Sequence, residues 1–150
     1  MCSSDLAQGF GDWRVVEGDM ADHASAAQLT DAALEWLAVH QDKPFFLYLH
    51  YMDPHSNYYA PEPYYSQAAG KAKTAVNGGY NQINDTFVQK GVIPTVNDIR
   101  QIQAYYDAEV SYWDSEFGRL MLQLVRSGVD ANTVVVVAAD HGEAFFEHGF

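Results

Sequence analysis

Two clusters of carboxylate and imidazole side chains are the groups in this chain best suited to chemistry. The first contains Asp53 and His55, and the second contains Asp140 and His141 followed by Gly142. A carboxylate beside an imidazole makes a mixed oxygen and nitrogen ligand pair for a divalent cation, and a glycine lets the backbone turn sharply beside the ion. Asp140 and His141 are therefore candidate metal ligands. The alternative is that Asp140 caps the following turn while His141 is an ordinary surface residue.

Two histidines extend the chemistry that these clusters could perform. A neutral His55 can hydrogen-bond a non-bridging oxygen of an anionic ester, and a protonated His55 can act as a general acid toward the leaving group. The alternative is a loop histidine in the turn that Asp53-Pro54 begins. His148 comes seven positions after His141, so this pair does not match the helical H-E-x-x-H zinc motif, and the chemistry of zinc peptidases is not indicated.

Each cluster directly follows an apolar run that is typical of a buried strand. The runs cover residues 44–50 and 134–139, and both are continuous rather than alternating, as in strands covered on both faces. Ligands of open α/β sheets bind outside the carboxyl ends of the strands. If the two strands are parallel and near neighbours, the two clusters converge at one edge of the sheet.

Two amphipathic helices are predicted to position these strands. The first covers about residues 26–40, with Ser25 as its N-cap. The second covers about residues 96–127, with a capping box of Thr95 and Asp98 at its start and Gly128 at its end. Apolar residues at steps of three and four predict one continuous buried stripe along the second helix, made of Ile99, Ile102, Tyr106, Val110, Trp113, Phe117, Leu120 and Leu124. The order helix, strand, long loop, helix, strand predicts an α/β fold.

The connection between the first strand and the second helix, about residues 51–94, is longer than the loops of compact domains. Such a length indicates a functional loop or an insertion. The connection contains a tyrosine-rich patch of Tyr58, Tyr59, Tyr64 and Tyr65. These rings could form a stacking wall for a carbohydrate or aryl group, or they could pack together as the connection's own core, and the sequence favours neither.

Charge and composition exclude several classes of function. Asp and Glu number 20 against 8 Lys and Arg, so the formal net charge is −12, which opposes binding to nucleic acid or to an anionic membrane. No apolar run approaches the roughly 20 residues of a transmembrane helix. Cys2 is the single cysteine, so neither an internal disulfide nor a cysteine-based zinc framework can form.

Three ordered blocks of this sequence resemble the sulfatase family of the alkaline phosphatase superfamily. In the first block, residues 29–37 are similar to a family helix, and residues 43–55 are similar to the strand and "D-P-H-x-P-Y" loop that follow it. In the second, residues 106–118 are similar to the family's "Y-x-A-E-V-x-x-x-D-x-x-x-G" helix. In the third, residues 132–149 are similar to its "N-T-x-V-x-x-x-S-D-H-G-E…E-H-G" signature.

This resemblance implies a fold, a reaction and site residues. The fold would be part of an alkaline-phosphatase-like α/β sandwich, with a mostly parallel central sheet flanked by helices. The reaction would be hydrolysis of sulfate esters of small molecules or carbohydrates at a divalent-metal site, usually calcium, with magnesium or manganese as alternatives. Asp140 and His141 would be metal ligands, His55 would contact the sulfate group, and His148 would lie near the rim of the active site.

The chain also departs from the family pattern. Asn57 stands where the family places a proline, and Ala139 stands where serine is common. The larger departure concerns the nucleophile, a Cys or Ser in a "C/S-x-P/A-S-R" motif whose cysteine is oxidised to formylglycine, because Cys2-Ser3-Ser4-Asp5 does not match it. We therefore expect residues 1–150 to be an internal part of a sulfatase catalytic domain, inactive alone, with the formylglycine nucleophile elsewhere.

Two other functions are consistent with the sequence. Phosphonate and phosphate ester hydrolases and phosphoglycerol transferases of the same superfamily share the Asp-His-Gly-Glu run at residues 140–143. A nucleophile segment containing threonine would favour this phosphoryl chemistry. The second alternative is a non-catalytic module, derived from the enzyme, that binds carbohydrate or protein.

Overall fold

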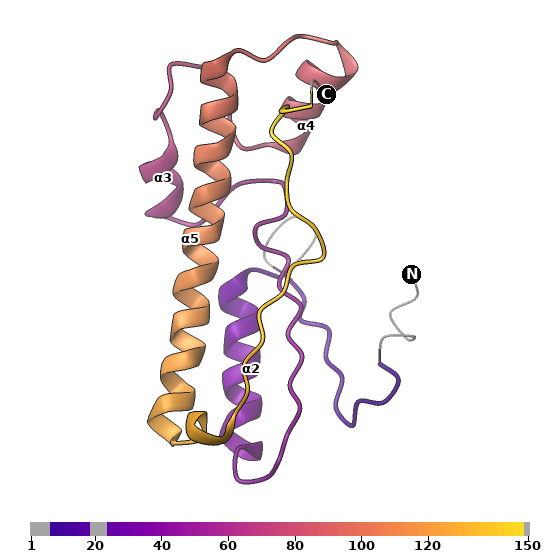
Figure 1. The fold of residues 1–150 in the computed structure, drawn as a ribbon, viewed down its shortest axis with the longest axis vertical. Helices are drawn as coiled ribbons and strands as arrows, with labels where there is room; N and C mark the ends of the chain where they lie inside the picture. The colour runs from indigo at the N-terminus through magenta and orange to yellow at the C-terminus, as the bar shows by residue number, and fades with distance from the viewer. Residues whose placement is uncertain (1–6, 19–23, 149–150) are drawn as a thin grey trace.

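The computed structural model describes residues 7–18 and 24–148, and two long helices dominate it (Figure 1). The elements in chain order are α2 (Ala26–His40), α3 (Tyr64–Ala68), α4 (Tyr80–Ile83), a π-helical turn (Asn84–Gln89), α5 (Val96–Ser127) and a 3₁₀ turn (Asp130–Asn132). Helix α5 runs most of the length of the molecule, with α2 packed against one half of it and α3 against the other (Figure 1). Within the described ranges, no helix combines the length and the apolar character that crossing a membrane requires.

Both long helices begin and end where their capping residues predict. Ser25 caps α2, and the Gln28 side chain accepts a hydrogen bond from the Ser25 amide at 3.0 Å. Thr95 and Asp98 form the corresponding capping box of α5. Gly128 ends α5 with a left-handed φ of 75°, a conformation that is favourable for glycine and costly for most other residues. The predicted bounds of both helices are confirmed.

The predicted strand at residues 44–50 is not formed, because the described part of the chain contains no strand. This segment runs instead as extended chain along α2 (Figure 1). Alternate side chains, those of Phe45, Leu47 and Leu49, pack on a core shared by α2 and α5, whereas Phe46 is 76 % exposed. Covered and exposed side chains alternate along this segment, as they do in a pleated strand with one covered face. The prediction of two covered faces is therefore wrong for this structure.

The predicted strand at residues 134–139 is likewise absent from the described structure. The segment follows the 3₁₀ turn as extended chain and runs in the same direction as residues 44–50 (Figure 1). Its valines are exposed, Val134 to 90 % and Val136 to 80 %. A strand is defined by hydrogen bonds to a neighbouring strand, and neither extended segment has one among the described residues.

The connection at residues 51–94 covers the half of α5 that α2 leaves open. It is not a bare loop, because α3, α4 and the π-helical turn lie within it. Tyr65 stacks on Tyr105 with ring centroids 4.9 Å apart, and Tyr64 lies against Tyr112 at 5.7 Å. Tyr58 is buried in the same core. These contacts favour the interpretation of the tyrosine patch as the connection's own core.

The buried face of α5 is wider than the predicted stripe. Ile102, Leu120 and Leu124 are buried as predicted, but Val110 is 39 % exposed. Different segments pack on the two halves of the helix, so its covered face turns along its length. The buried residues that the stripe omits all belong to the half covered by the connection, and they are Gln101, Tyr105, Ala108, Glu109 and Tyr112.

Candidate functional site

The structure brings together the two segments that carry the predicted site residues. The phenol of Tyr58, three residues after His55, donates a hydrogen bond to Glu143 Oε2 at 2.9 Å. Tyr106 on α5 contacts both segments, since its ring lies 5.8 Å from that of Tyr58 and 5.3 Å from that of Phe145. The structure thus brings the residues that follow His55 beside those that follow His141, through a helix and a hydrogen bond rather than a sheet edge. The convergence of the predicted site residues themselves stays a prediction.

The Tyr58 phenol that donates the hydrogen bond to Glu143 is buried. Its side chain is 4 % exposed, and the ring meets Tyr106 edge to face. Burial, and next the hydrogen bond to Glu143, raise the pKa of the Tyr58 phenol. The phenol therefore keeps its proton, and Glu143 accepts from it as a carboxylate.

Tyr58→Phe is expected to lower the free energy of unfolding by about 1–2 kcal/mol, because it removes a hydrogen bond to a charged group and keeps the ring. The loss stays modest since the freed Glu143 carboxylate is exposed and regains water. Urea denaturation at neutral pH measures this loss in the free energy of unfolding. Tyr80→Phe, which alters a ring that is 51 % exposed, is the matched control and is expected to change little. Equal effects of the two changes would contradict the role given to the Tyr58 hydroxyl.

His55 lies on the surface with one ring nitrogen engaged. Its Nδ1 is 2.7 Å from the carbonyl oxygen of Ser56. A carbonyl oxygen only accepts, so Nδ1 carries the hydrogen in this contact and Nε2 is the atom available to a substrate. Nε2 is then an acceptor in the neutral ring, so His55 can donate a hydrogen bond or a proton to an anionic ester from this exposed loop only when its imidazole is protonated.

Asp140 and His141 form an adjacent oxygen and nitrogen pair. His141 Nε2 lies 3.8 Å from Asp140 Oδ2, and the two side chains are 68 % and 86 % exposed. His141 Nδ1 is 2.8 Å from the Gly142 carbonyl oxygen, so in the neutral ring Nδ1 carries the hydrogen and Nε2 keeps the lone pair. That carbonyl, and next the Asp140 carboxylate, raise the pKa of the His141 imidazole. The pair has the chemistry of metal ligands.

The pair does not complete a metal site in the described structure. No group of three or more His, Cys, Asp or Glu side chains within residues 7–18 and 24–148 is placed to hold an ion. Calcium takes about six to eight oxygen ligands, so Asp140 and His141 would supply only part of its coordination. His148 is exposed at the end of the described residues, beyond the Phe145–Phe146 contacts.

Two carboxyls near the loop of His55 are buried, and the sequence analysis included only one of them, Asp53, among the candidate groups. Asp53, in the loop that ends at His55, is 6 % exposed, and Glu109 on α5 is 2 % exposed. Burial, and next the charge of Asp53 and a hydrogen bond to it, raise the pKa of the Glu109 carboxyl. The helical spacing that puts Glu109 on the same face as Tyr105 and Tyr112 was the available signal, since those rings are buried.

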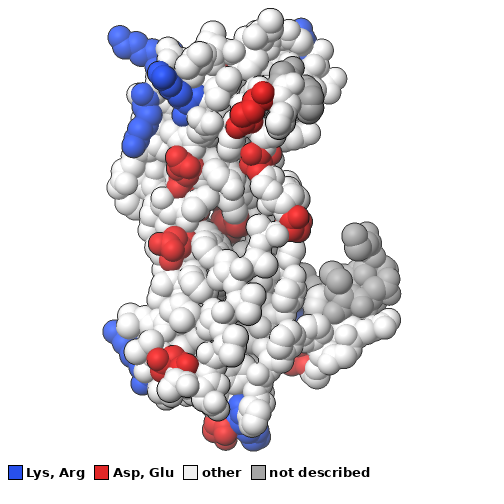
Figure 2. Space-filling model, viewed as in Figure 1, with Lys and Arg blue, Asp and Glu red and all other residues white. Residues whose placement is uncertain are grey.

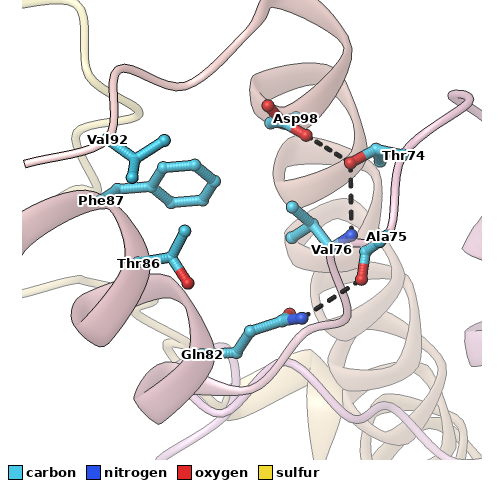
Figure 3. A pocket seen from close by; sticks show the side chains of 8 residues that line it. All are labelled: Thr74, Ala75, Val76, Gln82, Thr86, Phe87, Val92 and Asp98. Carbon is cyan, nitrogen blue, oxygen red and sulfur yellow. Dashed lines mark hydrogen bonds between the residues drawn. The ribbon is translucent and has the colours of Figure 1, made fainter. Parts of the chain in front are cut away.

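One hollow of the described surface lies apart from these residues. A cavity of about 310 Å³ lies between α5 and the π-helical turn, with Thr74, Phe87 and Asp98 among the residues that line it (Figure 3). In the wall of this cavity, the Thr74 hydroxyl donates a hydrogen bond to the Asp98 carboxylate and accepts one from the Val76 amide (Figure 3). None of the predicted site residues lines this cavity. One residue that lines it, Phe87, has its ring 5.6 Å from that of Phe146, which lies between Glu143 and His148.

Acidic side chains predominate over the middle of the visible face. Figure 2 shows them there and again at the lower end, beside basic side chains, with further basic side chains at the upper end. An anionic ester that approached such a surface would be repelled unless a positive group were added there.

Comparisons with known proteins agree on one family. The family model described as Sulfatase matches residues 5–150. Arylsulfatase K of Mus musculus is 28 % identical over 149 residues, covering 81 % of this chain and 26 % of its own length. The multifunctional alkaline phosphatase superfamily protein PehA of Trinickia caryophylli is 24 % identical over 140 residues, covering 79 % of this chain and 27 % of its own.

A third curated relative also matches part of this chain. The endo-4-O-sulfatase of Bacteroides thetaiotaomicron is 30 % identical over 101 residues, covering 67 % of this chain and 18 % of its own length. No solved structure matches this chain. The chain thus spans about a quarter or less of the length of these curated relatives.

Proposed function

This chain belongs to the sulfatase family, and we propose that it contributes part of the active site of an enzyme that hydrolyses sulfate esters. Membership implies the alkaline-phosphatase-like α/β fold. The observation that carries the proposal is the Tyr58–Glu143 hydrogen bond, because it joins the loop of His55 to the block of Asp140 and His141. Hydrolysis needs both halves of a site at one place.

We infer that the central sheet of that fold includes residues 44–50 and 134–139. Both segments are extended, follow the same direction and expose large apolar side chains, among them Phe46 and Val134. Strands from elsewhere in the protein would cover these side chains and supply the missing hydrogen bonds. In this arrangement residues 1–150 are a partial catalytic domain, and the formylglycine nucleophile lies outside it.

The metal of the proposed site is held in part by Asp140 and His141. Their exposed, adjacent side chains support this assignment, and so does the lone pair that His141 Nε2 keeps in the neutral ring. Calcium is the ion we propose, with magnesium and manganese as alternatives. When bound, it supplies the positive charge that polarises the sulfuryl oxygens.

Two histidines have proposed roles toward the substrate. Protonated His55 donates its Nε2 hydrogen to a sulfuryl oxygen or to the leaving oxygen, because its Nδ1 hydrogen is held by the Ser56 carbonyl. His148, exposed at the end of the described residues, would contact the substrate at the rim. The printed names of the relatives suggest small-molecule or carbohydrate sulfate esters as substrates.

Phosphoryl chemistry is the second candidate function. It is favoured by the similarity to a protein named as a multifunctional member of the alkaline phosphatase superfamily. Sulfate and phosphate esters are similar in shape and differ in charge, so the described residues could accept either group. A phosphonate or phosphate ester would replace the sulfate ester at the same site.

A comparison of esters tests the proposed function. The intact protein that carries this sequence is expected to hydrolyse an aryl sulfate faster than the matched aryl phosphate or aryl phosphonate, and to lose this activity after chelation of divalent ions. The 150-residue chain alone is the control and is expected to show no turnover. Faster hydrolysis of the phosphate or phosphonate would overturn the proposal in favour of phosphoryl chemistry, and no hydrolysis of any ester would favour a binding module.

A further inference from the structure

The turn at residues 77–80 lies against the loop that carries His55, and the proposed reaction gives this turn no role. The backbone amide of Tyr58 donates a hydrogen bond to the carbonyl oxygen of Gly78 at 2.8 Å. Both residues are buried, so this contact belongs to the packed part of the 51–94 connection. The turn is therefore in direct backbone contact with the residues that follow His55.

Only a residue without a side chain fits at Gly78. A Cβ atom at this position would overlap the carbonyl oxygen of Tyr58 and would lie 2.8 Å from its carbonyl carbon. Both are backbone atoms, so any larger residue must push the loop and the turn apart. At Gly79 the nearest atoms are instead the Tyr59 hydroxyl and the side-chain oxygen of Asn77, and the Tyr59 side chain is 43 % exposed. A Cβ atom at Gly79 can therefore be accommodated by movement of side chains.

A second hydrogen bond joins the loop to the turn through Asn57. The Tyr80 amide donates to the side-chain oxygen of Asn57 at 2.6 Å. Tyr80 is the first residue of α4, and its N-cap, Gly79, makes no side-chain hydrogen bond to the helix. The first amides of a helix have no partner within it, so Asn57 caps α4 from outside. Asn57 is also where the chain departs from the family pattern, and a proline side chain could not accept this hydrogen bond.

We propose that Asn57 and Gly78 are positioning residues that fix the loop of His55 to the turn at residues 77–80 and so set where the His55 imidazole stands. The His55 side chain is exposed, so packing does not fix it and its position follows that of the adjoining backbone. The effect on catalysis rests on the proposed function, whereas the attachment of the loop to the turn does not.

Tyr58 connects this attachment to the rest of the proposed site, because it is held at both ends. Its amide is bound to Gly78 at 2.8 Å, and its hydroxyl is bound to Glu143 at 2.9 Å. Its ring thus spans from the turn to the segment at residues 140–143. A displacement of the loop at Gly78 is therefore expected to alter the placement of His55 relative to that segment.

Hydrogen exchange of single amides in the intact protein tests the contact at Gly78, whatever the protein catalyses. Gly78→Ala forces the loop from the turn, so the Tyr58 amide is expected to exchange about tenfold faster or more, as loss of one hydrogen bond predicts. Gly79→Ala, in the same turn, is the matched control and is expected to leave this amide near the wild-type rate. An unchanged Tyr58 amide in Gly78→Ala, or equal effects of the two changes, would overturn the proposal.

The hydrogen bond of Asn57 is tested by removing its oxygen and then restoring it. Asn57→Ala is expected to speed exchange of the Tyr80 amide by about tenfold, because the acceptor is lost. Asn57→Asp keeps an oxygen at the same place and is expected to restore slow exchange. A Tyr80 amide that is as fast in Asn57→Asp as in Asn57→Ala would contradict the role given to Asn57, and so would one that neither change affects.

A double-mutant cycle tests whether the attachment acts through His55. If the intact protein hydrolyses sulfate esters, Gly78→Ala is expected to lower kcat/KM for an aryl sulfate by about 10- to 100-fold, the cost of misplacing a catalytic group by about 1 Å. In a protein that already carries His55→Ala, the same change is expected to cost less than about threefold, because no imidazole is left to misplace.

The outcomes separate this inference from the proposed function. Losses from Gly78→Ala and His55→Ala that multiply would show that Gly78 supports the fold without positioning His55, and they would overturn the proposal. Amides that exchange as expected in a protein that hydrolyses no sulfate ester would support the attachment and overturn the proposed function alone.

Discussion

Replacing Asp140 with alanine is expected to lower the rate of sulfate ester hydrolysis by the intact protein more than about 100-fold. Loss of a residue that merely orients a metal ligand already costs about 10- to 100-fold, and Asp140 is itself proposed as a ligand. The structure supports this assignment because the Asp140 carboxylate is exposed and stands beside the His141 imidazole, 3.8 Å from Oδ2 to Nε2. A carboxylate in this position has no packing role that the change would remove, so the fold should be retained.

Two controls separate loss of the ion from loss of structure. Asp107→Ala removes another exposed carboxylate, on α5, and is expected to leave both the rate and the thermal stability unchanged. Calorimetric titration with calcium is expected to show weaker binding to the Asp140→Ala protein than to wild type, and excess calcium should restore part of the rate. Normal activity in Asp140→Ala would refute the ligand assignment, and so would normal calcium affinity.

The helices were predictable from sequence because their signals are local. Ser25 and Thr95 mark the two starts through hydrogen bonds that reach only three residues along the chain. Gly128 marks an end through its own backbone conformation. None of these signals depends on which segment packs against the helix, so tertiary structure does not alter them.

The strands were not predictable in the same way, because a strand needs a partner. The apolar run at residues 44–50 correctly indicates extended chain with an apolar face, and Leu47 does pack on the helices. Whether the opposite face is covered depends on neighbours that the run itself does not specify. The same holds for residues 134–139, whose valines are exposed here.

The sequence suggests which residues could form the site, but it does not predict the contacts that join their segments. Motif spacing singles out His55, Asp140, His141 and His148 as candidates, and the α/β pattern predicts that their segments meet. The contact that joins the two segments in the structure, from Tyr58 to Glu143, links residues far apart in sequence. Its geometry depends on how the 51–94 connection folds over α5, and a connection of this length has no local signal that fixes its path.

Acidity of the chain has a physical explanation if the proposed function holds. Carboxylates that hold a cation raise the negative charge of the protein, and the cation then presents positive charge to an anionic substrate. The acidic side chains over the middle of the face in Figure 2 would thus oppose substrate binding in the absence of the ion and tolerate it in its presence. Chelation should therefore weaken substrate binding as well as turnover.

Changing His55 is the second substitution with a large expected effect. His55→Ala in the intact protein is expected to lower kcat/KM for an aryl sulfate by about 10²- to 10⁴-fold, the range contributed by a general acid or base. The structure leaves Nε2 available to the substrate, since Nδ1 is held 2.7 Å from the Ser56 carbonyl oxygen. The side chain is exposed, so the loss should come without a comparable fall in thermal stability.

His55→Gln distinguishes a proton donor from a hydrogen-bonding group. Glutamine can hydrogen-bond a sulfuryl oxygen but cannot give up a proton to the leaving oxygen. We therefore expect His55→Gln to be as slow as His55→Ala on a sulfate ester with a poor leaving group and to recover part of the rate on one with a good leaving group. His50→Gln, which changes an exposed histidine on the preceding extended segment, is the matched control and should leave both rates unchanged. Full recovery by His55→Gln on both esters would show that His55 binds the sulfate group without transferring a proton, and an unchanged rate in His55→Ala would remove it from the site.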